Sequence, residues 1–145
     1  MSCTEAAKLL DGLHVLIVED EPLIGMSVEE AIRDAGGIPM HVENDRDAYA
    51  ELEARAASLG ALVVDVNLGE GTTGFDVARF ARRLNPALPV VYLSGGPEQW
   101  AAWFGVDGAA FLSKPVADAE LIRTIAELND RNGRPDRAMP LPRST

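Results

Sequence analysis

Five short hydrophobic runs recur along the chain, and four of them end directly in charged or hydroxyl residues. The first, third and fourth runs are continuously apolar and rich in β-branched residues, which is typical of strands buried on both faces of a parallel sheet. The second run is weaker than the others. The runs span residues 14–18, 38–42, 61–64, 89–93 and 109–112. They predict five β-strands.

The segments between the runs show helical spacing of apolar residues. The first begins at Pro22, whose missing N–H costs nothing in a first helical turn, and Gly36–Gly37 ends it. Its expected apolar face consists of Leu23, Met26, Val28, Ala31 and Ile32. A second helix follows, with Asp45 or Asp47 as its expected cap. Its apolar residues are Ala48, Leu52 and Ala56.

Three further helices are predicted in the second half of the chain. Thr72 or Thr73 precedes the first of them, which spans residues 75–84. Its apolar side consists of Val77, Phe80, Ala81 and Leu84. A short helix is expected over Pro97–Phe104, and the last helix over Asp118–Asn129. The inward residues of the last helix are Leu121, Ile122, Ile125 and Leu128.

The alternation of strand and helix defines the expected architecture. Five β-then-α units indicate an open α/β sandwich around a parallel sheet with right-handed crossovers. We expect one domain over residues 13–129, preceded by an N-terminal extension at 1–12. Residues 130–145 hold four arginines and three prolines, and we expect a flexible tail there.

The 145 residues include 13 Lys and Arg against 23 Asp and Glu, a net charge of −10. This balance argues against direct binding to nucleic acid or to a membrane surface, since both need clustered basic residues. The single cysteine, Cys3, cannot form an internal disulfide, and no Cys/His cluster predicts a zinc site. His14 and His41 are each expected to be ordinary solvated or core residues. Without a signal peptide or an apolar span, we expect a cytoplasmic protein.

Polar residues that could take part in catalysis or ligand binding lie where four of the predicted strands end. They are Glu19, Asp20, Asp65, Ser94 and Lys114. Functional groups gather at the carboxyl ends of the strands in open α/β sheets, so we expect these side chains to converge on one edge. Three adjacent carboxylates repel each other, and a hard cation such as Mg²⁺ would resolve that conflict. With an ammonium and a hydroxyl beside it, Asp65 is the best candidate for a nucleophile toward a phosphoryl group.

Four motifs sit at these strand ends in order: VLIVEDE at 15–21, LVVDVNLGEGTTG at 62–74, VVYLSGG at 90–96 and FLSKPV at 111–116. They resemble the receiver domain of two-component response regulators over residues 14–129. The resemblance implies a flavodoxin-like fold with strand order 2-1-3-4-5. It also implies a stand-alone signalling protein, not an enzyme, that accepts a phosphoryl group from a sensor histidine kinase or a histidine phosphotransfer protein.

The same resemblance assigns a metal site and a phosphoacceptor. Asp65 would be the phosphoacceptor and would share Mg²⁺ with the other acids. Asp20 would bind the ion directly and Glu19 mainly through water. Asn67 would offer its backbone carbonyl.

The resemblance further assigns the phosphoryl contacts and the switch. Lys114, followed by a cis Pro115, would pair with the phosphoryl group. Ser94 would hold a phosphoryl oxygen in the activated state. Phe111 matches the aromatic switch position, although it is equally compatible with a plain core aromatic.

The chain departs from the family pattern after the acceptor, where Leu68 is followed by Gly69-Glu70-Gly71 instead of proline. This leaves open a receiver-like interaction module that works without phosphorylation. A phosphohydrolase of the haloacid-dehalogenase type fits less well, because its nucleophile lies on the first strand in an Asp-x-Asp pattern. A flavodoxin-type FMN binder would need a hydroxyl-rich loop where Glu19-Asp20-Glu21 stands.

Output would pass to a downstream protein through the face formed by Pro97–Phe104, Phe111 and Asp118–Asn129. The short aromatic segment cannot easily bury all of Trp100, Trp103 and Phe104. We therefore expect at least one exposed tryptophan there.

Overall fold

The computed structural model describes residues 8–68, 72–95 and 105–133. In chain order its elements are β1 (His14–Val18), α2 (Pro22–Asp34), β2 (Ile38–Val42), α3 (Asp45–Arg55), the 3-10 turn η1 (Ala56–Ser58), β3 (Ala61–Asp65), α4 (Gly74–Leu84), β4 (Val90–Ser94), β5 (Ala110–Ser113) and α6 (Asp118–Gly133). All five predicted strands are confirmed, with β4 and β5 shifted by one residue. The predicted helix at Pro97–Phe104 and its two tryptophans lie outside the described residues.

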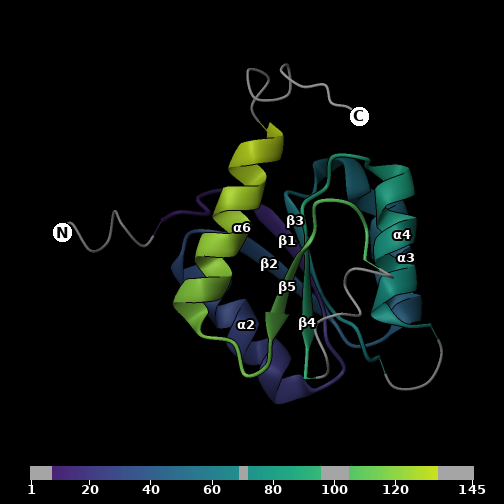
Figure 1. The fold of residues 1–145 in the computed structure, drawn as a ribbon, viewed down its shortest axis with the longest axis horizontal. Coiled ribbons are helices and arrows are strands. Elements are labelled where there is room, and N and C mark those ends of the chain that lie inside the picture. The colour runs from purple at the N-terminus through teal and green to yellow at the C-terminus, as the bar shows by residue number, and fades with distance from the viewer. Residues whose placement is uncertain (1–7, 69–71, 96–104, 134–145) are drawn as a thin grey trace.

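The five strands form one parallel sheet in the order β2-β1-β3-β4-β5, which confirms the predicted flavodoxin-like topology. Helices α2 and α6 cover one face of the sheet, and α3 and α4 cover the other (Figure 1). In the register of the central strands, Val18 lies opposite both Val42 and Val64. The carboxyl ends of β2, β1 and β3 therefore lie at one edge.

Alternate residues of the central strands face opposite layers of the core. On β1, Leu16 and Val18 belong to the cluster under α3 and α4, while Val15 and Ile17 belong to the cluster under α2 and α6. Every residue of β3 and β4 is buried. The continuous apolar runs are therefore explained by burial on both faces of the sheet.

Two details of the predicted helices are wrong on α2 and α3. Leu23 and Met26 are 79% and 57% exposed, because the buried stripe of α2 passes through Gly25, Val28 and Ile32 instead. The cap of α3 is neither Asp45 nor Asp47: the Asn44 side chain accepts the Asp47 N–H at 2.8 Å.

The other predicted apolar faces are largely confirmed. Ala48, Leu52 and Ala56 are buried, as are all four inward residues of α6. On α4, Val77 and Ala81 are buried, but Leu84 lies 44% exposed in the last turn. Helix α6 continues to Gly133, four residues beyond its predicted end.

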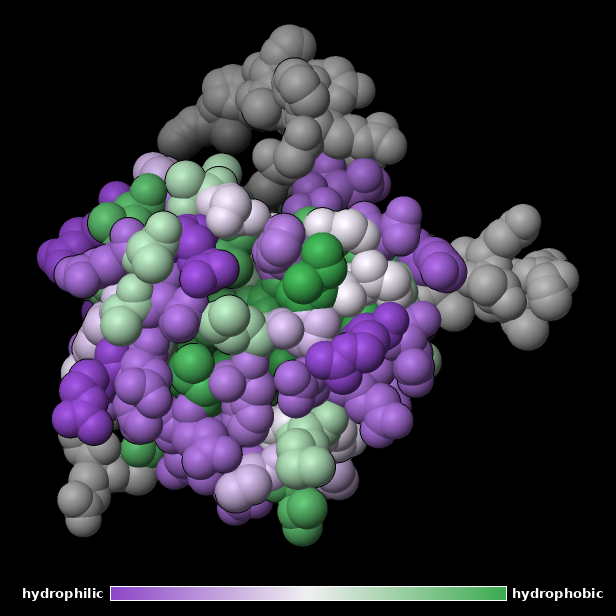
Figure 2. Space-filling view, turned by 180° about the vertical axis from the view of Figure 1, so that it is seen from behind, coloured by the Kyte–Doolittle hydropathy of each residue, from purple (hydrophilic) through white to green (hydrophobic). Residues whose placement is uncertain are grey.

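Few large hydrophobic residues are exposed in the part of the chain that the structure describes. The face seen from behind in Figure 2 is predominantly hydrophilic, and its hydrophobic residues form separate small patches. Among the described residues, no helix combines the length and the apolar composition needed to cross a bilayer.

Candidate phosphoryl and metal site

The backbone ladder of the sheet extends one residue beyond several strands and holds the site residues in place. The Glu19 N–H donates to the Val42 carbonyl at 3.1 Å, just past the end of β1. The Lys114 N–H donates to the Ser94 carbonyl at 2.8 Å, just past the end of β5. Asp65 is the last residue of β3. Rigid strands therefore carry these side chains to one place, as their positions in the sequence predicted.

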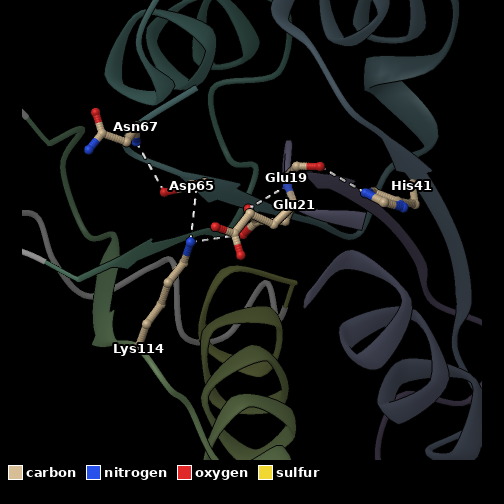
Figure 3. A network of polar contacts seen from close by, with 6 residues as sticks. All are labelled: Glu19, Glu21, His41, Asp65, Asn67 and Lys114. Atoms are coloured by element: carbon tan, nitrogen blue, oxygen red, sulfur yellow. Dashed lines mark hydrogen bonds and ion pairs between the residues drawn. The ribbon is translucent and has the colours of Figure 1, made fainter. Parts of the chain in front are cut away.

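Lys114 joins the two buried acids of the site (Figure 3). Its Nζ lies 3.0 Å from Asp65 Oδ2 and 3.1 Å from Glu19 Oε1. The Lys114 side chain is 20% exposed, whereas the side chains of Glu19 and Asp65 are 0% and 5% exposed. One ammonium thus stands between two carboxylates that have almost no contact with water.

A third acid completes the cluster. Glu19, Asp20 and Asp65 each offer a carboxylate oxygen, and these oxygens all lie within 4.8 Å of one another. Backbone N–H groups hold two of the carboxylates: Glu21 N–H donates to Glu19 Oε2 and Asn67 N–H donates to Asp65 Oδ1, each at 3.1 Å. The acids are therefore oriented by the backbone while their negative charges remain close together.

The electrostatics of the cluster are unfavourable for Glu19. Burial, and next the negative charge of Asp65, raise the pKa of Glu19 to about 7, although the Glu21 N–H and Lys114 oppose the shift. For Lys114, burial alone would lower the pKa, but the hydrogen bonds and charges of Asp65 and Glu19 outweigh burial and raise it. The ammonium therefore stays charged, and Glu19 loses its proton only near neutral pH.

The donor set fits a small divalent cation. Lys114 can neutralise only one of three negative charges, and Glu19 Oε1 is buried without a well-aligned hydrogen bond, even though the ammonium lies within ion-pair distance. Hard cations such as Mg²⁺ prefer carboxylate oxygens and would supply the missing positive charge. Glu19, Asp20 and Asp65 are the residues that can hold such an ion.

The other predicted site residues lie on β4, on β5 and directly after β3. Ser94 is buried as the last residue of β4. Asn67 is exposed, and the contact that it makes to Asp65 uses its N–H. Phe111 is partly buried on β5, with its ring 6.2 Å from that of Tyr92. The Lys114–Pro115 peptide bond is cis, as the resemblance implied.

His41 is a neighbour of the site that the sequence did not indicate. It is partly buried on β2, and its Nε2 lies 2.9 Å from the carbonyl oxygen of Glu19 (Figure 3). The ring also packs against Gly25 of α2 so closely that a Cβ at that position would overlap it. The signal available in the sequence was the pairing of the first two strands, which places residue 41 beside the end of β1.

Comparisons with known proteins agree with this geometry. Residues 15–126 match the response regulator receiver domain family. The Phyllosphere-induced regulator PhyR of Methylorubrum extorquens is 25% identical over 114 residues, covering 79% of this chain and 42% of PhyR. The transcriptional regulatory protein TcrA of Mycobacterium tuberculosis is 30% identical over 136 residues, covering 92% of this chain and 50% of TcrA. The chain spans about half the length of these relatives.

Solved structures show the same fold. A response regulator receiver protein from Sinorhizobium medicae superposes with a TM-score of 0.80 at 29% identity, covering 85% of this chain and 98% of that one. A CheY-like receiver domain from Methanospirillum hungatei gives a TM-score of 0.76 at 21% identity, with the same coverage, and supports the fold alone. With the family match over most of its length, this chain belongs to the response regulator receiver domain family.

Proposed function

We propose that the chain accepts a phosphoryl group on Asp65, in a Mg²⁺-dependent reaction, from a histidine kinase or a histidine phosphotransfer protein. The observation that carries the proposal is the placement of Lys114 Nζ at 3.0 Å from Asp65 Oδ2 inside a cluster of three carboxylates. A structural salt bridge would need one acid for one ammonium. Excess negative charge around a buried aspartate is instead suited to binding a cation together with a transferred phosphoryl group.

The transfer follows from the groups present. A carboxylate oxygen of Asp65 attacks phosphorus in line and forms an O–P bond, while the P–N bond of the phosphohistidine breaks and its electron pair returns to the imidazole nitrogen. Lys114 then exchanges the Asp65 carboxylate for a phosphoryl oxygen. Before the exchange the ammonium is protonated, because its contacts with Asp65 and Glu19 outweigh burial and raise the pKa of Lys114.

A bound Mg²⁺ would neutralise charge on the phosphoryl oxygens during transfer. Glu19, Asp20 and Asp65 would hold the ion, with the Asn67 carbonyl as the further ligand that the family resemblance implies. Ionised Glu19 is the form that can serve the cation, so binding of the ion and loss of the Glu19 proton favour each other. Within this proposal the chain acts in the cytoplasm.

We assign the response to phosphorylation to Ser94 and Phe111. Ser94 would donate its hydroxyl to a phosphoryl oxygen, and Phe111, which is only partly buried, would change its position in response. The downstream protein would bind the face that includes Phe111, residues 97–104 and α6. Direct binding to nucleic acid or to a membrane is not part of this proposal.

The phosphodonor protein has a separate candidate surface beside the site. An open groove of about 450 Å³ runs between α2 and the segment that follows β5, and its lining includes Leu23, Ile24, Lys114 and Pro115. Leu23 is 79% exposed at the beginning of α2, although it is a large apolar residue. Because Lys114 belongs to both the groove and the site, a donor bound there would present its phosphohistidine next to Asp65.

The direct test is phosphorylation by acetyl phosphate with Mg²⁺, followed by intact-protein mass spectrometry. We expect a gain of one phosphoryl group in the wild type and none in Asp65→Asn. EDTA should also prevent the gain. Asp76→Asn is the matched control, because it removes a carboxylate from α4 that is not part of the site, and it should be phosphorylated normally.

The alternatives give different results in the same assay. No gain with acetyl phosphate or with a panel of histidine kinases would favour an interaction module that works without phosphorylation. Steady turnover of a small phosphate ester would instead indicate a phosphohydrolase. For the donor groove, Leu23→Ser should slow transfer from a phosphorylated kinase and leave the reaction with acetyl phosphate unchanged.

A further inference from the structure

Asp45 is the first residue of α3, but its carboxylate does not serve its own helix as a cap. Asn44 caps α3 by accepting the Asp47 N–H. The Asp45 carboxylate reaches instead to Thr72, 27 residues later in the chain. Its Oδ2 accepts the Thr72 backbone N–H at 2.8 Å and also the Thr72 hydroxyl. We call this pair of hydrogen bonds the Asp45–Thr72 clasp.

The clasp holds a segment that packs against the backbone of the phosphoacceptor. Thr72 is followed by Thr73, the N-cap of α4, and by Gly74, the first residue of that helix. Gly74 donates its N–H to the Val66 carbonyl at 3.1 Å. A Cβ on Gly74 would overlap the Asp65 carbonyl oxygen and would lie 2.9 Å from the Val66 Cα. The beginning of α4 is therefore packed against the backbone of Asp65 and Val66.

Helices α3 and α4 lie side by side on the same face of the sheet (Figure 1). The clasp connects the beginning of one helix to the segment entering the other. Thr72 is partly buried and Thr73 is exposed. A segment that is tied at two points has fewer accessible conformations, so less conformational entropy is lost when a ligand binds beside it.

We propose that Asp45 is a positioning residue for the phosphoacceptor: by tying Thr72, it holds the beginning of α4 against Asp65 and keeps the Asp65–Asn67 backbone in the arrangement that receives the cation. The inference rests on the proposed function of Asp65. It adds a residue from a different helix, which touches neither the acids of the site nor Lys114.

The first test uses the metal-free protein. Hydrogen exchange of the Thr72 and Gly74 amides should become roughly 10-fold faster or more in Asp45→Ala, the factor expected from loss of hydrogen bonds to a charged acceptor. Amides in β1 should exchange as in the wild type. Asp47→Ala is the matched control, because it removes another first-turn carboxylate of α3 that makes no contact with Thr72.

The second test is a Mg²⁺ titration by calorimetry, with acetyl phosphate labelling measured beside it. In Asp45→Ala we expect the Mg²⁺ affinity to fall by roughly 10-fold, the lower end of the effect of outer partners on metal sites. Labelling should need correspondingly more Mg²⁺ but should reach the wild-type rate at saturation. Thr72→Val keeps the backbone donor and should show a smaller change, and Thr72→Ser, which keeps both donors, should behave like the wild type.

Urea unfolding of each variant separates positioning from general loss of structure. If Asp45→Ala binds Mg²⁺ like the wild type, or if Asp47→Ala weakens binding equally, the inference is wrong. If Asp45→Ala lowers the saturated labelling rate while its Mg²⁺ affinity is unchanged, the inference is also wrong. A wild type that takes up no phosphoryl group would overturn the proposed function instead, and the exchange and Mg²⁺ measurements would still decide the role of Asp45.

Discussion

Two carboxylates, Glu19 just past the end of β1 and Asp45 at the beginning of α3, have opposite electrostatic surroundings. Glu19 is buried beside Asp65, its pKa is raised to about 7, and it shares one ammonium with that second acid. Asp45 lies closer to water and accepts two hydrogen bonds from Thr72, which lower its pKa. The negative charge of Glu19 is poorly stabilised by its surroundings, whereas that of Asp45 is stabilised by two hydrogen bonds.

The difference separates a group placed for chemistry from a group placed for structure. A carboxyl that is costly to ionise in the folded protein gains most when a cation or a phosphoryl group arrives. A carboxylate that is already satisfied gains nothing further and can hold a segment in place.

Lys114→Met should have the largest effect on stability. It removes the ammonium from two buried carboxylates and keeps an aliphatic side chain of similar length. In metal-free buffer at neutral pH, we expect the free energy of unfolding to fall by about 3 kcal/mol, the lower end for breaking a buried ion pair, because the Lys114 side chain is 20% exposed. Urea unfolding monitored by circular dichroism measures the loss.

Addition of Mg²⁺ should recover part of the stability of Lys114→Met, because the cation binds the folded state and not the unfolded chain. Lys8→Met, at an exposed position, should be nearly neutral with or without Mg²⁺. A loss that Mg²⁺ does not reduce would show that Lys114 contributes through packing and not through charge.

Gly74→Ala should have the next largest effect, because Gly74 lies between the clasp and the acceptor. The added Cβ would meet the backbone of Asp65 and Val66, which cannot move aside as a flexible side chain can. We expect a loss of roughly 1–3 kcal/mol on thermal or urea unfolding, as for overpacked interiors. Gly95→Ala is the control, since a Cβ there would meet no atom of the described residues within 4 Å. Equal effects at the two positions would contradict the close packing of α4 on Asp65.

The sequence predicted the strands and their order well, because continuous apolar runs have few alternatives to strands buried on both faces. It placed the ends of β4 and β5 one residue early. Ser94 and Ser113 face each other in the sheet, although their polarity suggested loops. It also assigned Leu23 and Met26 to the core, because helical spacing identifies apolar residues but not whether another element covers them.

The candidate site was predictable as far as topology determines it. The meeting of Glu19, Asp65 and Lys114 follows from parallel strands that end together. The contact of His41 with the Glu19 carbonyl depends on side-chain direction across the register. The Asp45–Thr72 clasp joins the beginning of α3 to the segment before α4, 27 residues later. Neither contact has a local signal in the sequence.

Glu19→Gln should change how stability depends on pH. The folded protein keeps the Glu19 proton up to about pH 7, whereas the unfolded chain releases it near pH 4.5, so the contribution of Glu19 to stability falls as the pH rises between these values. Relative to the wild type, Glu19→Gln should gain on the order of 1 kcal/mol per pH unit across this window. Urea unfolding in EDTA at several pH values measures the difference, and a constant difference would contradict the raised pKa.

Asp45→Asn should show the opposite pH dependence and the smallest effect. Because the pKa of Asp45 is lowered below 3.8 in the folded protein, ionised Asp45 stabilises the fold above that pH, and this contribution is lost as the pH falls through the folded-state pKa. Asp45 is only partly buried, so water screens the interaction and we expect less than about 1 kcal/mol at neutral pH. Thermal unfolding from neutral to acidic pH should therefore show the stabilities of the wild type and Asp45→Asn converging in acid, while the stabilities of the wild type and Glu19→Gln converge only below pH 4.5.

The control is Asp47→Asn, because the Asp47 carboxylate is not bound to Thr72. It should not reproduce the Asp45 profile. If Asp45→Asn instead remained equally destabilised in acid, its effect would come from the shape of the side chain, and the contrast between the two carboxylates would rest on Glu19 alone.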